Sequence, residues 1–375
     1  MLLKVITSYV LSFPAQTFMH LSCLLWRQSK TNIQLRRIVV KYKKYTLYLF
    51  IILLLLTVSQ IYCQEKLAQT GFQFLNVSSD ARACGMGEAM TSIPGYSGAL
   101  FFNPAGMAEL PNNLHATFSL NSWIADIKHT TFGLAYKPAK GQYGVFGLSV
   151  QSVDYGDLQG TIVWNNYDGY IDTEILKPSA LSLGIGYAKS LSSKFAVGGQ
   201  IKFNYQNLSK SIVPNGDELE TKRNVTDGIS YDFGTLYKTG IKSIAFGMFV
   251  RNYSTEVKFE EEGFQLPLLF SIGISADAFD WIELSGPKQE LLVAVDFTHP
   301  RAHPEQIKIG LEYTILEAFS LRGGYVSGNS QDDLSFGVGF SGFGLSKYLG
   351  LEIDYSYTPF EWFDNVQRFT IRYSL

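Results

Sequence analysis

Cysteine is scarce in this 375-residue chain, and the short motifs of common enzymes are missing. Three cysteines are too few for a disulfide framework or a zinc knuckle. The sequence holds no Gly-x-x-x-x-Gly-Lys, His-Glu-x-x-His, Cys-x-x-Cys or Gly-x-Ser-x-Gly, the motifs of phosphate-binding loops, zinc proteases, redox pairs and serine hydrolases. We therefore expect a protein that is not an enzyme, with no catalytic residue, no metal site and no cofactor.

Charge is also sparse and unevenly placed. Charged residues make up 17% of the chain and apolar residues 46%, which excludes a disordered chain. Residues 1–63 carry eight basic side chains and neither an acidic residue nor a glycine. The remaining 23 basic and all 33 acidic side chains give the rest of the chain a net charge of −10. An acidic body without a basic patch argues against a nucleic-acid partner.

The N-terminal part has the layout of an export signal. The basic stretch Lys41–Lys44 precedes an apolar run over 45–58, and a polar exit follows. That run is shorter than the ~20 residues that a permanent membrane helix needs, so we predict a signal peptide cleaved near Cys63/Gln64. A retained anchor and a lipoprotein processed at Cys63 are the alternatives. Residues 1–38 lie upstream of a complete signal, which indicates an over-extended start.

Beyond residue 113 the apolar residues recur with a period of two. Phe195, Val197, Ile201 and Phe203 alternate with small or polar residues, which is the pattern of a strand with one apolar face. Fourteen such segments, most of them roughly 10–14 residues long, predict an all-β fold, a 14-stranded antiparallel transmembrane β-barrel. The predicted strands lie near 114–124, 128–138, 143–155, 177–189, 194–207, 226–239, 241–253, 267–277, 290–299, 305–315, 317–326, 333–342, 348–358 and 365–375.

The opposite faces of these segments carry the charges. Ten charged side chains share this parity: Lys202, Arg251, Asp296, Lys308, Glu312, Arg322, Glu352, Asp354, Arg368 and Arg372. A Lys or Arg at mid-depth in hydrocarbon costs about 2–4 kcal/mol, so we expect these side chains to face a polar lumen. We expect a structural ion-pair cluster there, made of Glu312, Glu352, Asp354, Arg368 and Arg372. A soluble β-sandwich is the competing fold, which fourteen long strands without a sheet division disfavour.

Long and short links alternate in the first half of the predicted barrel. The links over 156–176, 208–225 and 254–266 are long, whereas those at 139–142 and 190–193 are tight. Outer-membrane barrels have short periplasmic turns and longer extracellular loops. We therefore expect a protein of the Gram-negative outer membrane, in contact with its lipid, with both chain ends in the periplasm.

Residues 64–113 do not alternate and precede the barrel as a separate segment. Five glycines between positions 85 and 106 permit tight turns in a confined space. Asn103 and Pro104 suit a turn or a helix start, with Asn103 as the cap and Pro104 at the first helical position of such a helix. We therefore divide the chain into an N-terminal extension with the signal (1–63), a hatch that plugs the lumen (64–113) and the barrel (114–375).

The predicted hatch resembles a known family. Phe74-Leu75, Asp80-Ala-Arg82, Gly85-Met-Gly87 and Asn103-Pro-Ala-Gly106 are similar to the N-terminal motifs of the PorV/PorQ family, within the FadL-like superfamily of outer-membrane proteins. The resemblance extends loosely over the barrel and is closest to PorV-like members. It implies a FadL-like 14-stranded barrel with an N-terminal hatch, in a bacterium of the Bacteroidetes type. The hatch residues that we expect to have a structural or binding role are Phe74, Asp80, Arg82, Gly85, Met86, Gly87, Asn103, Pro104, Ala105 and Gly106.

The same resemblance implies a function in protein transport. PorV-like members hold cargo proteins and pass them to a cell-surface attachment complex in type IX secretion. We therefore predict a non-enzymatic outer-membrane component of this system, with secretion subunits and cargo proteins as partners. A FadL-like channel for hydrophobic small molecules is the alternative.

Overall fold

The computed structural model describes residues 70–215, 218–259, 262–281, 289–328, 333–342, 350–360 and 363–375. The predicted signal peptide with cleavage near Cys63/Gln64 lies outside these residues, and so does the beginning of the predicted hatch. Within the described part, no helix is both long enough and apolar enough to cross a membrane.

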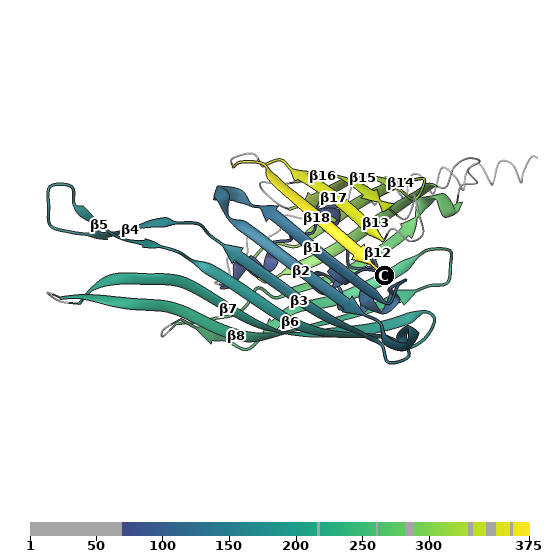
Figure 1. Ribbon diagram of the computed structural model, residues 1–375, viewed down its shortest axis with the longest axis horizontal. Coiled ribbons are helices and arrows are strands. Elements are labelled where there is room, and N and C mark those ends of the chain that lie inside the picture. The colour runs from purple at the N-terminus through teal and green to yellow at the C-terminus, as the bar shows by residue number, and fades with distance from the viewer. Residues whose placement is uncertain are drawn as a thin grey trace, which may run out of the picture. The chain divides into compact units, whose positions relative to one another are not determined.

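Fourteen antiparallel strands of the described chain close into one barrel (Figure 1). Each pairs with the next barrel strand along the chain, and β1 closes the ring by pairing with β18, as in His115↔Ser374. Every barrel strand lies on one of the fourteen predicted segments, so the predicted fold is confirmed. The strands are β1 (Leu114–Ser122), β2 (Lys128–Tyr136), β3 (Val145–Asp154), β6 (Ser179–Ser190), β7 (Phe195–Asn215), β8 (Glu218–Lys238), β9 (Ala245–Ser254), β12 (Leu269–Asp277), β13 (Gln289–Pro300), β14 (Gln306–Ile315), β15 (Phe319–Ser327), β16 (Leu334–Ser341), β17 (Leu351–Thr358) and β18 (Val366–Ser374).

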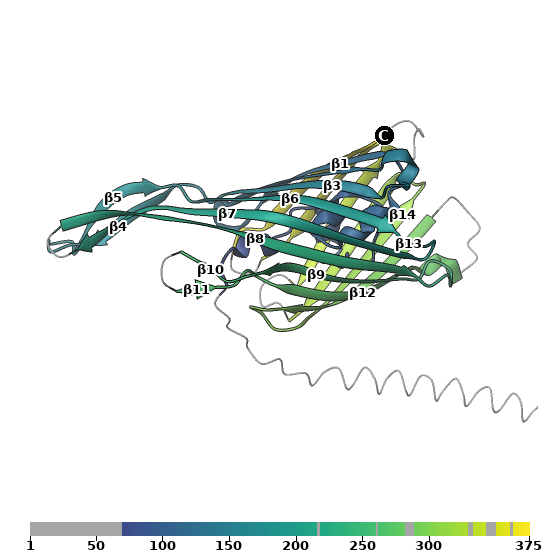
Figure 2. The ribbon, with the colours of Figure 1, turned by 90° about the horizontal axis from the view of Figure 1, so that it is seen from below.

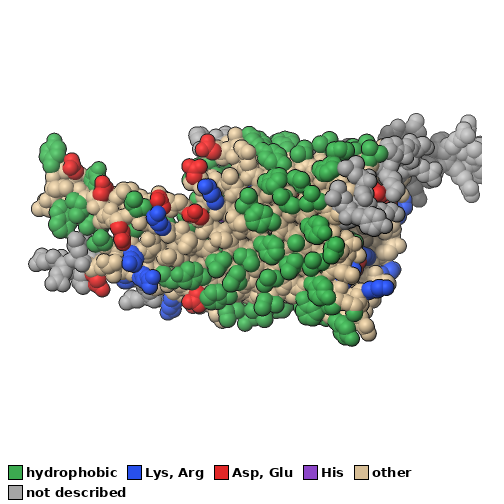
Figure 3. All heavy atoms as spheres, in the orientation of Figure 1, with side chains coloured by type: hydrophobic (Ala, Val, Ile, Leu, Met, Phe, Trp, Pro, Cys, Tyr) green, Lys and Arg blue, Asp and Glu red, His purple; other side chains and the backbone are tan. Residues whose placement is uncertain are grey.

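The two faces of the strands meet different surroundings. In β3, the apolar Phe146 and Leu148 are exposed on the outside, whereas Ser149 and Gln151 are buried on the inside. In the space-filling view, apolar side chains cover the barrel wall as one band, and charged side chains lie toward its ends (Figure 3). A barrel presents such an apolar belt to lipid. The two-residue period therefore separates a lipid-facing surface from a polar interior.

The charges predicted on the inner faces of the strands are found inside. Eight of the ten are buried, and Arg251 and Glu352 are half-buried. Many of them contact residues 70–113, which we call the inner segment.

Some of the predicted loops contain strands. The link over 156–176 forms the hairpin of β4 (Leu158–Val163) and β5 (Tyr170–Leu176), and a shorter hairpin joins β10 (Val257–Lys258) to β11 (Gly263–Phe264). β7 and β8 also continue past the barrel, as far as the pair Asn215↔Glu218. These arms project from the long-link end of the barrel (Figures 1 and 2). The loop prediction is wrong here because paired arms can form strands through the hydrogen bonds between their backbones, without one continuously buried apolar face.

The inner segment forms short helical turns against the inward side of the strands, where they are seen between the strands in Figure 2. α3 packs on β16 and β17, and η3 packs on β6, β7 and β8. The inner segment supplies most of the main apolar core, which Ala135, Val145, Ala188 and Ala294 complete from the wall. The turns are η1 (Gln73–Asn76), α3 (Ala81–Gly85), η2 (Ser97–Phe101) and η3 (Pro104–Glu109); η4 (Ile124–Asp126), η5 (Pro138–Gly141) and η6 (Ala278–Trp281) lie at strand ends.

Candidate functional site: contacts between the inner segment and the barrel wall

The inner segment has two halves, of which the first contains η1 and α3 and the second contains η2 and η3. A helix cap organises the first half. Asp80 is the N-cap residue of α3, and its Oδ1 accepts a hydrogen bond from the Ala83 N–H at 3.0 Å. A short acceptor side chain at this position satisfies an amide that the first helical turn leaves unpaired. Gly87, just after the helix, has a φ of 59°, a left-handed conformation that glycine adopts readily. This local geometry turns Arg82 toward the barrel wall.

A chain of ion pairs begins at Arg82. Its Nε donates to Glu312 Oε2 at 2.9 Å and its Nη2 donates to Glu312 Oε1 at 2.6 Å. Glu312, on β14, also binds Arg322 of β15, and Arg322 Nη1 reaches Asp354 Oδ1 of β17 at 2.6 Å. All three wall side chains are buried. Two-point contacts between guanidinium and carboxylate groups are among the strongest polar contacts in proteins.

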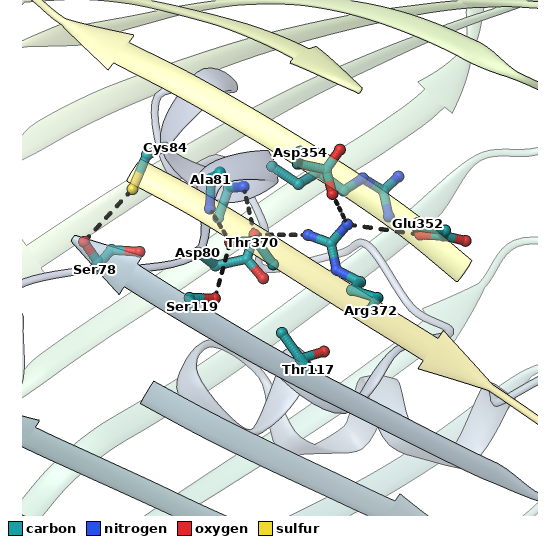
Figure 4. A network of polar contacts seen from close by, with 12 residues as sticks. Ser78, Asp80, Ala81, Cys84, Thr117, Ser119, Glu352, Asp354, Thr370 and Arg372 are labelled. Atoms are coloured by element: carbon teal, nitrogen blue, oxygen red, sulfur yellow. Dashed lines mark hydrogen bonds and ion pairs between the residues drawn. The ribbon is translucent and has the colours of Figure 1, made fainter. Parts of the chain in front are cut away.

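The chain of ion pairs returns to the inner segment through Arg372 of β18. Arg372 binds Asp354 with Nη1, and its Nη2 donates to Asp80 Oδ1 at 2.8 Å (Figure 4). Positive and negative side chains therefore alternate from Arg82 to Asp80, which are two positions apart in the chain, so that the series nearly closes on itself. We call this series the ion-pair ring; its members are Arg82, Glu312, Arg322, Asp354, Arg372 and Asp80. Removal of one partner from a buried pair costs about 3–5 kcal/mol, because the other charge is left uncompensated.

Three of the five residues predicted as a lumen cluster lie in this ring: Glu312, Asp354 and Arg372. Glu352 lies at its edge, half-buried, with Oε2 at 3.6 Å from Arg372 Nη1. The strand register explains this contact, since Glu352 and Arg372 are direct cross-strand partners.

The structure places Arg368, the fifth predicted member, elsewhere. Its Nε donates to the Ser78 carbonyl at 3.1 Å, and its Nη1 donates to Thr358 Oγ1 at 2.8 Å. Its cross-strand partners are Ser356 on β17 and Asn121 on β1, and neither is an acid. Arg368 therefore supports the backbone just before α3 and does not join the described ring.

Glycines in the wall let the backbone of the inner segment come close. A Cβ built on Gly324 of β15 would lie 1.9 Å from the Gly87 nitrogen, and one on Gly337 of β16 would lie 3.1 Å from the Gly85 Cα. Met86, between Gly85 and Gly87, is fully buried. The predicted Gly-Met-Gly motif is therefore the point of closest approach between α3 and the wall.

Asn103 caps η3 in the second half, as Asp80 caps α3 in the first. Its Oδ1 accepts from the Ala105 N–H at 3.1 Å, and Pro104 occupies the first helical positions of η3, as predicted. Its Nδ2 donates to the Thr91 carbonyl at 2.7 Å and to the Thr235 carbonyl of β8 at 2.9 Å. One amide side chain therefore starts η3 and fastens it to the wall.

The wall next to η3 also carries glycines at close contacts. A Cβ on Gly234 would lie 1.9 Å from Asn103 Oδ1, and one on Gly198 would lie 2.5 Å from the Ala105 nitrogen. Gly106 accepts a hydrogen bond at its carbonyl from the Gly95 N–H at 3.0 Å. The Asn-Pro-Ala-Gly motif thus fits a slot that larger wall residues would fill.

Phe74 lies apart from both groups. It belongs to a second apolar cluster with Phe72, Leu75, Val153 and Leu266. The rings of Phe72 and Phe74 lie 6.0 Å apart. This cluster anchors the beginning of the inner segment by apolar burial.

The sequence did not identify two further contacts. Lys308 Nζ lies 2.7 Å from Glu88 Oε2, and the Thr91 N–H donates to Asp296 Oδ2 at 2.9 Å. The strand parity marked Lys308 and Asp296 as inward, but their partners lie 220 and 205 positions away in the chain. The alternation along each strand shows that these two side chains point inward, but it does not show which residues they contact.

Tyr96 connects the two halves. The guanidinium carbons of Arg82 and Arg372 lie 5.9 and 5.7 Å from the centre of its buried ring. Cations over an aromatic face are attracted by the electron density of the ring. Tyr96, just before η2, therefore places the second half against the ion-pair ring of the first.

The charge states of the inner segment follow from these contacts. Burial by itself raises the pKa of Asp80, but Arg372 and the Ala83 N–H outweigh it and hold that pKa below its usual value. Burial likewise opposes ionisation of Glu88, and Lys308 lowers its pKa despite this. Burial raises the pKa of the free thiol of Cys84 to about 12. Asp80 and Glu88 are therefore ionised near neutral pH, whereas Cys84 is a neutral thiol and a poor nucleophile.

The inner segment and the barrel wall leave a small cavity between them. A cavity of about 30 Å³ is lined in part by Leu75, Asp80, Phe101, Lys202 and Arg251. A water molecule needs roughly 10–15 Å³ by this measure, so the cavity has room for about two. The described residues include no group of three or more His, Cys, Asp or Glu placed to hold a metal ion.

No family model and no curated protein matches this sequence. Solved structures do match. The toluene transporter TbuX of Ralstonia pickettii is 12% identical with a TM-score of 0.53, over 79% of this chain and 98% of that one. The toluene transporter TodX of Pseudomonas putida has the same identity and TM-score, over 82% and 98%. A FadL homologue of Pseudomonas aeruginosa is 11% identical with a TM-score of 0.52, over 83% and 100%.

At such low identity the matches concern the fold. They support the FadL-like part of the resemblance seen in the sequence and do not reach its PorV/PorQ part. This chain has the fold of the FadL-type outer-membrane β-barrels.

Proposed function

We propose that this chain is an outer-membrane channel for hydrophobic small molecules, with the inner segment as its closure. Three of the structures that share its fold are named as two toluene transporters and a monoaromatic hydrocarbon channel. The observation that carries the proposal is this shared barrel together with an inner segment held to its wall by side-chain contacts. The secretion role, predicted first from the sequence, becomes the second candidate.

The contacts of the inner segment suit a closure that moves. Hydrogen bonds and ion pairs exchange partners, and the first and second halves are fastened to different strands. The small cavity between them is lined by Leu75, Leu100 and Phe101 as well as by polar groups. A path that widened there would offer apolar surface to a passing molecule.

Uptake by whole cells tests the channel. A Gram-negative host without its own hydrocarbon channels produces the protein, and uptake of radiolabelled toluene is measured at limiting concentration. We expect saturable uptake above that of cells that lack the protein. Arg82→Ala, which frees the inner segment from Glu312, should raise the uptake rate. Lys128→Gln, an exposed change on β2, is the matched control. Equal uptake by producing and non-producing cells would refute the proposal.

A non-enzymatic role in type IX protein secretion is the second candidate. Besides the motif resemblance, the β4–β5 hairpin favours it, because this arm exposes Trp164, Tyr167 and Tyr170 beyond the barrel. Exposed aromatic side chains are common at protein-binding surfaces.

A pull-down from outer membranes in gentle detergent tests this candidate. Recovery of secretion subunits or cargo by the full chain, and its loss when the three aromatic residues are changed to Ser, would support it. Normal secretion of tagged cargo in a deletion strain would exclude it.

A further inference from the structure

A second and larger cavity lies at the short-turn end of the barrel. It has a volume of about 250 Å³ and lies between the end of η3, the turn that joins β2 to β3, and the end of β6. Its charged lining consists of Glu109, Lys137, Lys140 and Lys189. One wall therefore belongs to the inner segment and the others to the barrel.

The positive charge of this lining is not balanced. Glu109 already pairs with Lys238, whose Nζ lies 2.5 Å from its Oε2. Lys137 donates to the backbone carbonyls of Leu110 and Pro111, which carry no net charge. Within the described part of the chain, Lys140 and Lys189 form no side-chain hydrogen bond or ion pair. Three ammonium groups thus adjoin one carboxylate that is already neutralised.

We propose that this cavity binds a phosphate group. Its volume admits a tetrahedral oxyanion with a small substituent, and lysine binds phosphate as a concentrated point charge. Both inorganic phosphate and the headgroup of an anionic phospholipid carry this group. Short turns face the periplasm in barrels of this type, and both sources occur on that side. The site does not depend on which molecules the barrel passes.

Binding is measured on the full chain, purified in neutral detergent. Inorganic phosphate is titrated by calorimetry, and adducts with phosphatidylglycerol are counted by native mass spectrometry. Lys189→Gln should weaken binding about tenfold, since one charge-assisted contact is lost. Glu109→Gln should tighten binding several-fold, because it removes the only carboxylate of the lining described here and frees Lys238.

The control variant is Lys128→Gln, which makes the same charge change at the opposite end of β2. It should bind phosphate as the unchanged chain does. Saturable binding of inorganic phosphate identifies a free anion site, and binding of phosphatidylglycerol alone identifies a lipid headgroup site. Absence of saturable binding of both probes, or equal weakening by Lys128→Gln and Lys189→Gln, would overturn the proposal.

Discussion

The two halves of the inner segment are held to the same barrel by different chemistry. In the first half, Asp80, Arg82 and Glu88 each face an opposite charge on β14 or β18. In the second half, Asn103 binds uncharged carbonyls, and η3 fits against wall glycines such as Gly234. The ion pair that η3 forms with the wall, Glu109 with Lys238, is partly exposed and not buried. A buried ion pair depends on ionisation, whereas a close fit depends on volume. The two halves should therefore come loose under different conditions.

The largest effect is expected from loss of a shared acid in the ion-pair ring. Asp354→Ala leaves both Arg322 and Arg372 without their common partner, and all three side chains are almost completely buried. The free energy of unfolding should fall by about 3–5 kcal/mol, measured by urea titration of the protein in detergent micelles. Asp157→Ala is the control, because its pair with Lys177 is exposed and should contribute less than about 1 kcal/mol. Equal losses would show that the ring is not a special contact.

A larger side chain in the wall beside η3 should destabilise the second half. Gly234→Leu places side-chain atoms where Asn103 lies, since a Cβ there would be 1.9 Å from its Oδ1. Overpacking of this kind costs about 1–3 kcal/mol, and hydrogen exchange should become faster in η3 while α3 stays protected. Gly323→Leu is the control, because a Cβ at that position meets nothing within 4 Å. Faster exchange in α3 as well would show that the halves move together.

Loss of the Asn103 amide should have a smaller effect. Asn103→Ala removes the cap of η3 and two hydrogen bonds to carbonyls, and it leaves the glycine slot intact. We expect a loss of about 1–2 kcal/mol in the free energy of unfolding. Asn103→Ser keeps an uncharged capping oxygen and should recover part of this loss. No difference between the two variants would mean that the cap itself contributes nothing.

Acid should loosen the first half before the second. The pKa values of Asp80 and Glu88 are lowered in the folded chain. Their stabilising contribution is therefore complete above the ordinary carboxyl pKa of about 4 and is lost as the pH falls through the lower folded values. Hydrogen exchange in α3 should rise on going from about pH 6 to below about pH 3, after correction for the intrinsic rate. The carbonyl contacts of Asn103 involve no titrating group, and the Glu109–Lys238 pair of η3 is partly exposed and contributes little, so most of the protection of η3 should persist.

The smallest effect is expected at Cys84. Burial raises the pKa of its thiol to about 12, so iodoacetamide at about pH 8 should leave it unmodified in the folded protein, as few thiolates are present. Urea should expose it to full modification. Rapid labelling of the native chain, detected by mass spectrometry, would show that the first half opens often. Arg82→Ala, which loosens this half, should increase the labelling rate.

Each barrel strand was predictable from the sequence, because the alternation of apolar and polar residues depends only on neighbours along the chain. The outward Phe146 and the inward Gln151 of β3 differ in parity, and parity is visible in a single sequence. Asn103 with Pro104 was predictable for the same reason, since a helix cap involves only neighbours along the chain. The predicted grouping of Arg368 with the acids was less successful. Arg368 and Arg372 point to the same face of β18. Only the register between β17 and β18 places Arg372 opposite Glu352 and Arg368 opposite Ser356.

The arms beyond the barrel show the same limit. The stretch around Lys210 and Arg223 has no alternating apolar face, and a register shift just before Lys210 separates it from the barrel. Its strands exist because two long arms lie side by side, and that neighbourhood is not visible in either arm alone.

The sequence by itself determined the number of barrel strands, the face that each of these strands turns to lipid, and the cap of η3. These features depend on neighbours in the chain. The tertiary structure alone decided which charges meet, as in the contact of Arg82 with Glu312, 230 positions away. Such pairs depend on the closure of the barrel, on its register and on wall glycines that let the inner segment approach. No local pattern encodes those distances, because they arise only when all strands are in place.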